Sequence, residues 1–329
     1  MNEERVDDKP VVVEGNGSGN LVQAAETAVP PTPADDTIPP DNGNERIVLD
    51  EYPRFRLMAR IEHAILMTSF TILGITGLPQ MYAQWDWARW MINVMGGIEM
   101  VRVIHRWMAV LLVIGAFYHI FTSLYRGYVQ RERMRMLPVP IDYYNMVDYV
   151  KYNLGFIDEH PKMPKFNFGE KLEYWAVVWG TVIMVITGFM LWNPIATTAI
   201  LPGQIIPAAK AAHGYEALLA ILAIVIWHMY NVHIKHFNPS IFTGNLPRHQ
   251  MEEEHALELE RLEAGGHPWP EIDAPVLADR RRKFFIFSAV ASVIILVVLY
   301  WAFTFEETAI TTIPRVTRDV FVPLVTPSP

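Results

Sequence analysis

The chain has 329 residues, of which 51% are hydrophobic and none is cysteine, and its formal net charge is −8. The lack of cysteine excludes a disulfide framework, a cysteine-ligated iron–sulfur cluster, covalently attached haem and a thiol nucleophile. Residues 1–51 contain 12 acidic and 3 basic side chains, a net −9, which leaves the other 278 residues at +1. A body this close to neutral offers no basic surface to nucleic acid, so no nucleic-acid partner is expected.

The first segment, residues 1–51, is rich in Pro, Asp, Glu, Gly and Asn and shows no apolar periodicity. Such a composition buries too little apolar surface to offset the entropy cost of ordering. It also lacks the basic stretch followed by an apolar stretch that marks a signal peptide. We therefore predict a disordered, acidic, cytoplasmic tail.

Five later stretches are long and apolar enough to cross a bilayer, which takes about 20 residues of helix. The last of them has no charged residue between Phe284 and Phe305. The sequence therefore predicts an all-α membrane protein whose helices contact membrane lipid. The predicted spans are 61–80, 103–125, 173–193, 213–234 and 284–304.

Lysine and arginine are concentrated before the first span, between the second and third, and between the fourth and fifth. Because positively charged connections stay on the cytoplasmic side, the N-terminus is predicted inside and the C-terminus outside. The predicted parts after the tail are a four-helix transmembrane domain over 52–236, a cytoplasmic linker with a charged helix over 237–283, a fifth transmembrane helix over 284–305 and a short extracytoplasmic tail over 306–329.

Two of the predicted cytoplasmic segments have helical patterns. Residues 142–154 carry an apolar stripe and begin with Asp142 as a candidate N-cap, which predicts a helix lying on the inner membrane surface. Residues 248–264 are dense in charge and predict a helix whose faces are solvated.

Histidines inside the predicted spans are the strongest chemical signal, because ionisable groups in a bilayer are costly and mark functional sites. His105 and His119 are 14 residues apart in the second span, and His213 and His228 are 15 apart in the fourth. At 1.5 Å and 100° per residue, each pair lies on one side of its helix, about 21 Å apart along the second span and about 22 Å apart along the fourth. The six histidines within or at the ends of spans are His63, His105, His119, His213, His228 and His233.

Neutral imidazoles on facing helices bind the iron of a b-type haem without a covalent bond. The repeated histidine pair predicts two such haems, stacked to carry electrons across the bilayer. One alternative is a set of structural histidines that hydrogen-bond to carbonyls. Another is a proton path, for which Glu62 and Glu216 are the nearby carboxylates. A zinc site is disfavoured, because ligands about 20 Å apart on one helix cannot share an ion.

Six short segments follow in order along the first four spans: RIEH (60–63), ITGLP (75–79), VIHR (103–106), FNFGEKLEYW (166–175), ITGFMLW (186–192) and HMY (228–230). Together they resemble the formate dehydrogenase gamma-subunit and nickel-hydrogenase cytochrome b family of prokaryotic dihaem membrane cytochromes. The resemblance covers residues 54–236. It implies a multi-pass protein of the bacterial plasma membrane that serves a respiratory chain.

The resemblance also implies a set of haem ligands. In that family the haem near the outer face is held by a histidine that opens the second span and one that opens the fourth, which here are His105 and His213. The haem near the inner face is held by histidines of the first span and of the end of the fourth, which here are His63 and His228.

His119 departs from this pattern. It sits at the depth of the inner haem, where a cytochrome b6-like pairing would use it in place of His63, and the sequence leaves both alternatives open. A third haem between His119 and His233 is disfavoured. The 15-residue interval in the fourth span is one residue longer than the family pattern.

The family further implies a menaquinone or ubiquinone pocket beside the inner haem, at an Asn-x-Gly segment that matches Asn167 and Gly169. An amide can donate to a quinone carbonyl, and glycine permits close approach. Glu170 is the candidate for proton uptake, with Glu173 behind it. An ordinary helix cap is the alternative role for Asn167, and the two roles are compatible.

Arg102 and Arg106 lie on the predicted outer side, next to His105. They are candidate partners of haem propionates, because the arginine fork suits carboxylates. The alternative is an interaction with lipid phosphate.

These features predict a membrane-anchoring b-type cytochrome subunit that passes electrons between an extracytoplasmic iron–sulfur or multihaem cytochrome c partner and the quinone pool. The chain has no catalytic domain of its own, so substrate chemistry is assigned to another subunit. One alternative is a stand-alone b561-like oxidoreductase acting on quinol or superoxide. The other is a membrane anchor without haem, whose histidines are structural.

Overall fold

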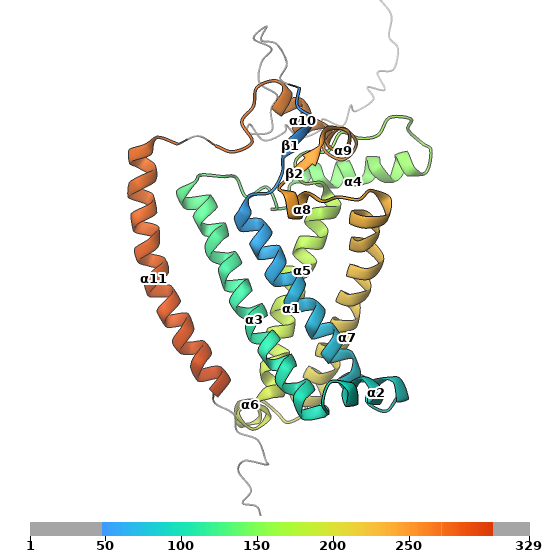
Figure 1. The fold of residues 1–329 in the computed structure, drawn as a ribbon, viewed down its shortest axis with the longest axis vertical. Coiled ribbons are helices and arrows are strands. Elements are labelled where there is room, and N and C mark those ends of the chain that lie inside the picture. Colours follow the sequence, from blue (N-terminus) through green and yellow to red (C-terminus); the bar gives the residue numbers. More distant parts are fainter. Residues whose placement is uncertain (1–47, 271, 305–329) are drawn as a thin grey trace, which may run out of the picture. The chain divides into compact units, whose positions relative to one another are not determined.

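The computed structural model of the protein describes residues 48–270 and 272–304. Most of the predicted acidic tail and the whole predicted tail 306–329 lie outside these described residues. The described part is mostly helical (Figure 1).

The five predicted spans are confirmed as long apolar helices. Each begins several residues before its apolar stretch, because the helix continues through polar turns that the hydropathy pattern does not mark. The helices are α1 (Leu57–Met81), α3 (Ile98–Leu124) continued by the π-helical turn η1 (Tyr125–Val129), α5 (Phe168–Trp192), α7 (Ile205–Leu222) continued by the π-helical turns η2 (Ala223–His228) and η3 (Tyr230–Lys235), and α11 (Ala274–Thr304).

Four of these helices form a bundle. Helix α1 packs along α3, helix α5 packs along α7, and α1 also contacts α7. Helix α11 packs against η1, where Phe284 and Tyr125 have ring centres 5.3 Å apart. The contact between α1 and α7 joins the two helix pairs, and side chains of all four helices line the interior of the bundle.

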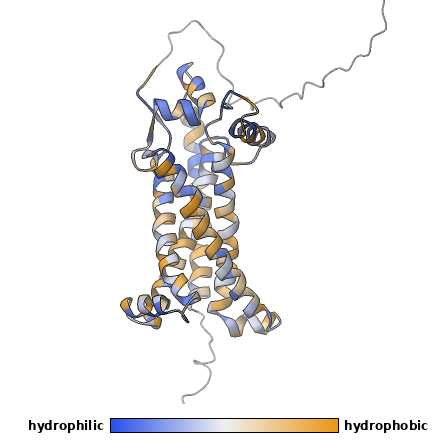
Figure 2. Cartoon of the chain, turned by 90° about the vertical axis from the view of Figure 1, so that its right-hand side faces the viewer, coloured by the Kyte–Doolittle hydropathy of each residue, from blue (hydrophilic) through white to orange (hydrophobic). Residues whose placement is uncertain are grey.

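The outer surfaces of the spans are apolar. Val290, Val297 and Ile226 are 59%, 62% and 66% exposed, although a water-soluble protein buries such side chains. Figure 2 shows hydrophobic residues along the helices and hydrophilic ones concentrated at one end. This distribution is the one expected for helices that are solvated by lipid.

A small polar layer sits at the end of the bundle where α1 begins. It consists of β1 (Glu51–Pro53), β2 (Asn245–Pro247), α8 (Ser240–Thr243), α9 (Arg248–Glu254) and α10 (Ala256–Glu263), and we call it the cap. Its strands pair antiparallel, with Tyr52 opposite Leu246. Its apolar core consists of Tyr52, Leu246, Met251, Leu259 and Leu262.

The cap corrects the prediction of one solvated helix over 248–264. The helix is broken at His255, whose side chain is buried, and the second half packs into the cap core. Glu258 and Arg261 are also buried, and they form a two-pronged ion pair with both N···O distances 2.9 Å. The charge density of this segment misled the prediction, because its charges neutralise one another inside the protein.

Three short helices lie at the ends of the bundle. Helices α2 (Asp86–Val94) and α6 (Pro194–Ile200) lie at the end opposite the cap, which we call the distal end. Helix α4 (Pro140–Asn153) runs beside the cap end and presents Tyr143 and Val150 outward, as the amphipathic pattern predicts.

The predicted N-cap of α4 is wrong by one turn. The helix begins at Pro140, which suits the first helical position, and Asp142 lies inside the first turn, where its carboxylate accepts from the Val139 N–H at 2.8 Å. The same carboxylate also binds Lys171 of α5, at 2.7 Å and 2.9 Å. Asp142 therefore fixes α4 to the bundle.

Candidate functional site

Two histidines face each other near the distal end of the bundle. His105 from α3 and His213 from α7 have ring centres 6.4 Å apart, with ring planes inclined by 67°. On each ring Nδ1 lies 2.9 Å from a threonine hydroxyl, that of Thr76 for His105 and that of Thr187 for His213.

A glycine follows each of these threonines and leaves room for the imidazole beside it. A side-chain Cβ at Gly77 would lie 3.2 Å from Cε1 of His105, and one at Gly188 would lie 3.3 Å from Cε1 of His213. Both distances are tighter than ordinary carbon–carbon contact. Each Thr-Gly dipeptide, one on α1 and one on α5, therefore gives its imidazole a hydroxyl contact and the space to fit.

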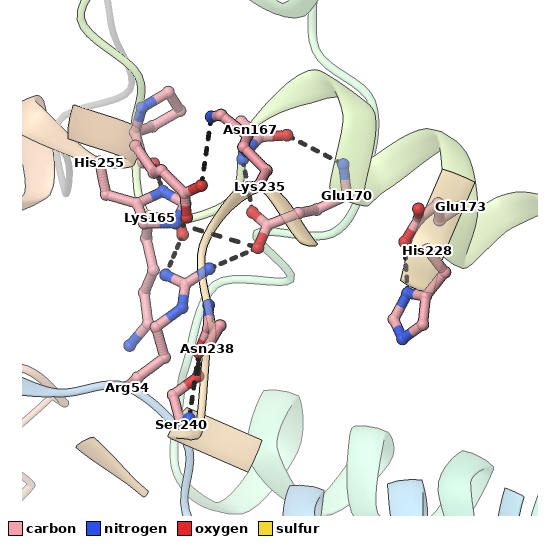
Figure 3. Close-up of polar contacts among 12 residues, drawn as sticks. Arg54, Lys165, Asn167, Glu170, Glu173, His228, Lys235, Asn238, Ser240 and His255 are labelled. Carbon is pink, nitrogen blue, oxygen red and sulfur yellow. Dashed lines mark hydrogen bonds and ion pairs between the residues drawn. The ribbon is translucent and has the colours of Figure 1, made fainter. Parts of the chain in front are cut away.

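A second pair of histidines faces each other near the cap end. His63 from α1 and His228 from η2 have ring centres 6.2 Å apart, with planes inclined by 31°. The Nδ1 atom of His228 lies 3.1 Å from Oε2 of Glu173 on α5 (Figure 3). The carboxylate beside this histidine is thus Glu173, which the sequence had placed behind Glu170.

The extra residue in the fourth span is absorbed by a π-helical turn. In an ideal α-helix an interval of 15 residues would leave His213 and His228 about 60° apart around the axis. The π-helical turn η2 lies between them and accommodates one extra residue. With the extra residue accommodated, this interval places its two histidines on one side of the helix, as the interval of 14 residues does for His105 and His119. Both His213 and His228 therefore reach the bundle interior.

His119 makes different contacts. Its Nδ1 lies 2.6 Å from Oε2 of Glu62, and its Nε2 lies 2.9 Å from the hydroxyl of Tyr174. Thr122 donates to the other oxygen of Glu62. Both imidazole nitrogens of His119 therefore have protein partners on neighbouring helices.

The two facing pairs fit haem. Two bonds of about 2 Å from a metal to imidazole nitrogens, plus about 1.1 Å from each nitrogen to its ring centre, separate two ring centres by about 6.2 Å. The observed separations are 6.2 Å and 6.4 Å. The glycines at the distal pair leave the space that a bulkier side chain would take from the ring.

The predicted quinone segment forms the start of α5. The side-chain oxygen of Asn167 accepts from the Glu170 N–H, and Glu170 accepts from the Asn167 N–H, each at 2.9 Å. The expectation of a helix cap at Asn167 is thus confirmed. Since the cap uses the amide oxygen, the NH₂ group of the side chain is the part that is left for a ligand carbonyl. A Cβ at Gly169 would lie 3.2 Å from Oδ1 of Asn167 and 3.7 Å from the Trp227 ring, so this turn packs against the residue that precedes His228.

Glu170 also connects α5 to the cap. Arg54, just after β1, donates to Oε1 of Glu170 at 2.6 Å, and His255 Nε2 lies 3.9 Å from the same oxygen (Figure 3). Burial, reinforced by the nearby guanidinium of Arg54, lowers the pKa of His255 to about 4. Burial likewise lowers the pKa of Lys165, which precedes α5, to about 8.

The two arginines predicted to contact haem propionates have protein partners. Arg102 forms an exposed ion pair with Glu99 at 3.0 Å. The guanidinium carbon of Arg106 lies 4.7 Å from the ring centre of Trp192. Both lie close in sequence to His105, at the distal end of α3.

Sequence reasoning missed three residues of these sites, Thr76, Thr187 and His255, and gave Glu173 another role. Thr76 and Thr187 are part of the repeated segment ITG, which in the sequence supports only the family resemblance. Glu173 lies 55 residues from His228, and His255 lies in a segment that was read as solvated. The repeat of Thr-Gly in two spans is the one signal that could have found the threonines.

Comparison with known proteins finds similarity to membrane cytochromes b. A family model described as prokaryotic cytochrome b561 matches residues 145–244. The formate dehydrogenase cytochrome b556(fdo) subunit of Escherichia coli (strain K12) is 21% identical over 184 residues, 55% of this chain and 78% of the relative. The nitrate-inducible cytochrome b556(Fdn) subunit of the same strain is 20% identical over 215 residues, 64% and 93% of the two chains.

A third relative, the formate dehydrogenase cytochrome b556 subunit of Haemophilus influenzae (strain ATCC 51907 / DSM 11121 / KW20 / Rd), is 22% identical over 140 residues, 43% of this chain and 54% of the relative. These matches, with the five apolar helices, agree with the resemblance read from the sequence motifs. The chain is a multi-pass membrane cytochrome b that takes part in electron transfer with haem b, and it is similar to the prokaryotic cytochrome b561 family and to the cytochrome b subunits of formate dehydrogenase.

Proposed function

We propose that this protein is the membrane-anchoring subunit of a respiratory oxidoreductase and relays electrons through two haems b, each held by two histidines. The observation that carries the proposal is the presence of two facing imidazole pairs, with ring centres 6.4 Å and 6.2 Å apart, at opposite ends of one bundle. Haem b, when bound, accepts and releases one electron at a time. The work of the chain is to hold two such groups in line across the bilayer.

The proposed ligands are His105 and His213 at the distal end and His63 and His228 at the cap end. His63 is favoured over His119 because its ring faces that of His228. His119 instead spends its two nitrogens on Glu62 and Tyr174. Its proposed role is structural, tying α1, α3 and α5 together beside the cap-end pair.

The cap end is proposed to be cytoplasmic, with the N-terminus inside and the C-terminus outside, in a bacterial plasma membrane. The support is the positive charge around it, because cytoplasmic connections are enriched in lysine and arginine. The described basic residues of this end include Arg54, Arg56, Arg126, Arg135, Lys162, Lys165 and Arg248.

The quinone, menaquinone or ubiquinone, is proposed to bind at the start of α5. The NH₂ of Asn167 would donate to one quinone carbonyl, at the turn where Gly169 packs between Asn167 and Trp227. Because Trp227 precedes His228, this position is next to the cap-end histidine pair. Electrons would therefore pass over a short distance between quinone and the inner haem.

Reduction of a quinone to a quinol takes two electrons and two protons. Glu170 is proposed to pass the protons, since its carboxylate is 33% exposed and borders the cap. Arg54 holds that carboxylate in place. With electrons arriving from the distal side and protons from the cap side, the reaction moves charge across the membrane.

An extracytoplasmic redox protein, an iron–sulfur or multihaem cytochrome c subunit, is proposed as the partner at the distal end. The short helices α2 and α6 frame that end, and Arg102 and Arg106 are the proposed contacts of the outer haem propionates. The relatives are named as subunits of formate dehydrogenase, which favours a subunit over a stand-alone oxidoreductase.

The test is to purify the full chain in detergent and measure haem b per polypeptide by the pyridine haemochrome method. We expect two haems b, and we expect menadiol to reduce them. Gly169→Val, which would push a side chain against Oδ1 of Asn167 and the Trp227 ring, should slow reduction by menadiol, while reduction by dithionite and the haem content stay unchanged. Absence of a Soret band would leave only the anchor without haem, and reduction by superoxide in preference to quinol would favour the stand-alone enzyme.

A further inference from the structure

Two threonines hold the distal histidine pair by the same contact. Thr76 on α1 lies 2.9 Å from Nδ1 of His105, and Thr187 on α5 lies 2.9 Å from Nδ1 of His213. Each threonine immediately precedes the glycine that makes room for the same ring. The two halves of the bundle therefore repeat one arrangement, Thr-Gly on one helix against a histidine on the next.

The direction of these hydrogen bonds follows from the number of hydrogens. A hydroxyl has one hydrogen, and a backbone carbonyl can only accept. The Thr76 hydroxyl lies 2.7 Å from the carbonyl oxygen of Ile72, and the Thr187 hydroxyl lies 2.6 Å from that of Ile183. Each hydroxyl donates to its carbonyl and accepts from the imidazole, so the hydrogen is on Nδ1 and the lone pair is on Nε2.

Burial stabilises the hydrogen bonds between these threonines and histidines. Thr76 is 1% exposed and Thr187 is 8% exposed, so water does not compete for either hydroxyl. A buried hydroxyl that loses its acceptor or its donor is costly. Rotation of either ring would break a hydrogen bond that no water replaces, and the rings are therefore held in one orientation.

We propose that Thr76 and Thr187 are positioning residues that set the tautomer, the orientation and the electron-donating strength of both axial imidazoles, and thereby the reduction potential of the outer haem. The inference rests on the proposed function, since it needs haem between His105 and His213. An acceptor on Nδ1–H makes an imidazole a stronger electron donor at its other nitrogen. A stronger donor stabilises ferric over ferrous iron, so these hydroxyls lower the potential.

The cap-end pair has a different partner, which makes the inference specific to one haem. There His228 meets the carboxylate of Glu173 instead of a hydroxyl. Removing a threonine hydroxyl at the distal end should therefore shift one of the two redox transitions and leave the other in place.

The experiment compares Thr76→Val, Thr187→Val and the double variant with wild type, in full-length purified protein. Valine keeps the shape of threonine and removes the hydroxyl. Thr71→Val is the matched control, because Thr71 lies on the same helix and is exposed to the outside of the bundle. The readouts are the haem content, the two midpoint potentials from a potentiometric titration of the α band, and the low-spin ferric EPR signal.

We expect each single Val variant to raise the midpoint potential of one haem. At a fixed potential its ratio of ferrous to ferric iron should rise several-fold, up to about tenfold, and tenfold corresponds to about 59 mV for one electron. The double variant should shift the same haem further and change its EPR signal, while Thr71→Val matches wild type. Unchanged potentials in both single variants, at full haem content, would overturn the inference and leave the proposed function standing. One haem or none in wild type would overturn both.

Loss of haem from Thr76→Val is resolved by Thr76→Ser, which restores a hydroxyl in a smaller side chain. Recovery of haem and of the wild-type potential in Thr76→Ser supports the inference, because the hydroxyl is what the two residues share. Failure of Thr76→Ser to recover either would overturn it, since the role of Thr76 would then be one of packing.

Discussion

The ring of His63 faces that of His228 at 6.2 Å, while His119 at the same depth faces Tyr174, with its Nε2 2.9 Å from the phenol hydroxyl. The family resemblance implied His63 as the inner ligand, and the sequence kept His119 as the alternative because it sits at the same depth. The structure separates them by their partners. One histidine is free to share a metal with His228, and the other is committed to two side chains.

This relationship predicts which histidine variants lose haem. His63→Ala should halve the haem b per polypeptide, because the cap-end iron would keep one imidazole instead of two, and the distal haem should stay. His119→Ala should keep both haems, with a lower unfolding temperature because Glu62 and Tyr174 lose a hydrogen-bond partner. The pyridine haemochrome assay checks both, and halved haem in His119→Ala with full haem in His63→Ala would reverse the assignment.

The inclination of the ring planes predicts two different EPR signals. The planes of His105 and His213 are 67° apart, and those of His63 and His228 are 31° apart. Steeply crossed imidazoles bring two iron d orbitals close in energy, which raises the largest g value of a low-spin ferric haem, and near-parallel imidazoles separate them. We expect the distal haem to give the higher value in a frozen-solution spectrum of the oxidised protein. The signal that survives in His63→Ala identifies it, and a lower value for that surviving signal would contradict the prediction.

The large features of the fold could be predicted from the sequence, and the reasons are general. Five apolar helices follow from the thickness of the bilayer, and the histidine pairs follow from helical periodicity. The cap could not be predicted, because β1 and β2 have three residues each and are joined only by long-range pairing. The burial of its charged helices could not be predicted either, because Glu258 and Arg261 look solvated in the sequence but neutralise each other inside the cap.

The details of the site escaped prediction for a different reason. A threonine in an apolar helix usually bonds its own backbone, as Thr76 does with Ile72, and only the packing of α1 on α3 shows that it also serves His105. The pairing of Glu173 with His228 depends in the same way on how α5 sits beside η2. Periodicity gives the face of a helix but not the neighbour that the face meets.

Glu173 should set the potential of the cap-end haem. Its carboxylate lies 3.1 Å from Nδ1 of His228 and strengthens that imidazole as an electron donor. Glu173→Gln should raise the midpoint potential of the cap-end haem. Its ratio of ferrous to ferric iron at a fixed potential should rise several-fold, where tenfold corresponds to about 59 mV. Potentiometric titration measures it, and Glu159→Gln, at an exposed position between α4 and α5, is the matched control. A shift of the distal potential instead would contradict the assignment of His228.

Gly77 should tolerate no side chain. A Cβ there would lie 3.2 Å from Cε1 of His105, so the ring must move by a few tenths of an ångström. Gly77→Ala should lower the occupancy of the distal haem after gel filtration, by a loss of affinity on the order of tenfold. Gly127→Ala, where nothing lies within 4 Å of the added Cβ, should keep two haems per chain. Equal haem content in both variants would show that the ring has room to spare.

The cap should lose stability in mild acid through His255. Its Nδ1 lies 2.9 Å from the carbonyl oxygen of Pro164, and its ring is enclosed by Arg54, Glu170 and Glu258. Burial lowers its pKa from 6.5 to about 4, so between these values the unfolded chain binds a proton that the folded chain does not. The free energy of unfolding therefore falls as the pH drops from 6.5 toward 4, by up to about 3 kcal/mol for this group.

The measurement for His255 is the unfolding temperature from intrinsic fluorescence between pH 7.5 and about pH 4. His255→Gln cannot gain a proton, so its unfolding temperature should fall less over this range than that of wild type. His249→Gln, at an exposed position of α9 in the same cap, should follow the wild-type curve. Carboxylates that do not contact His255 titrate equally in all three proteins, and the difference between the curves reports His255 together with its neighbour Glu170. If the two variants gave parallel curves, the neutral buried state of His255 would not be what destabilises the cap in acid.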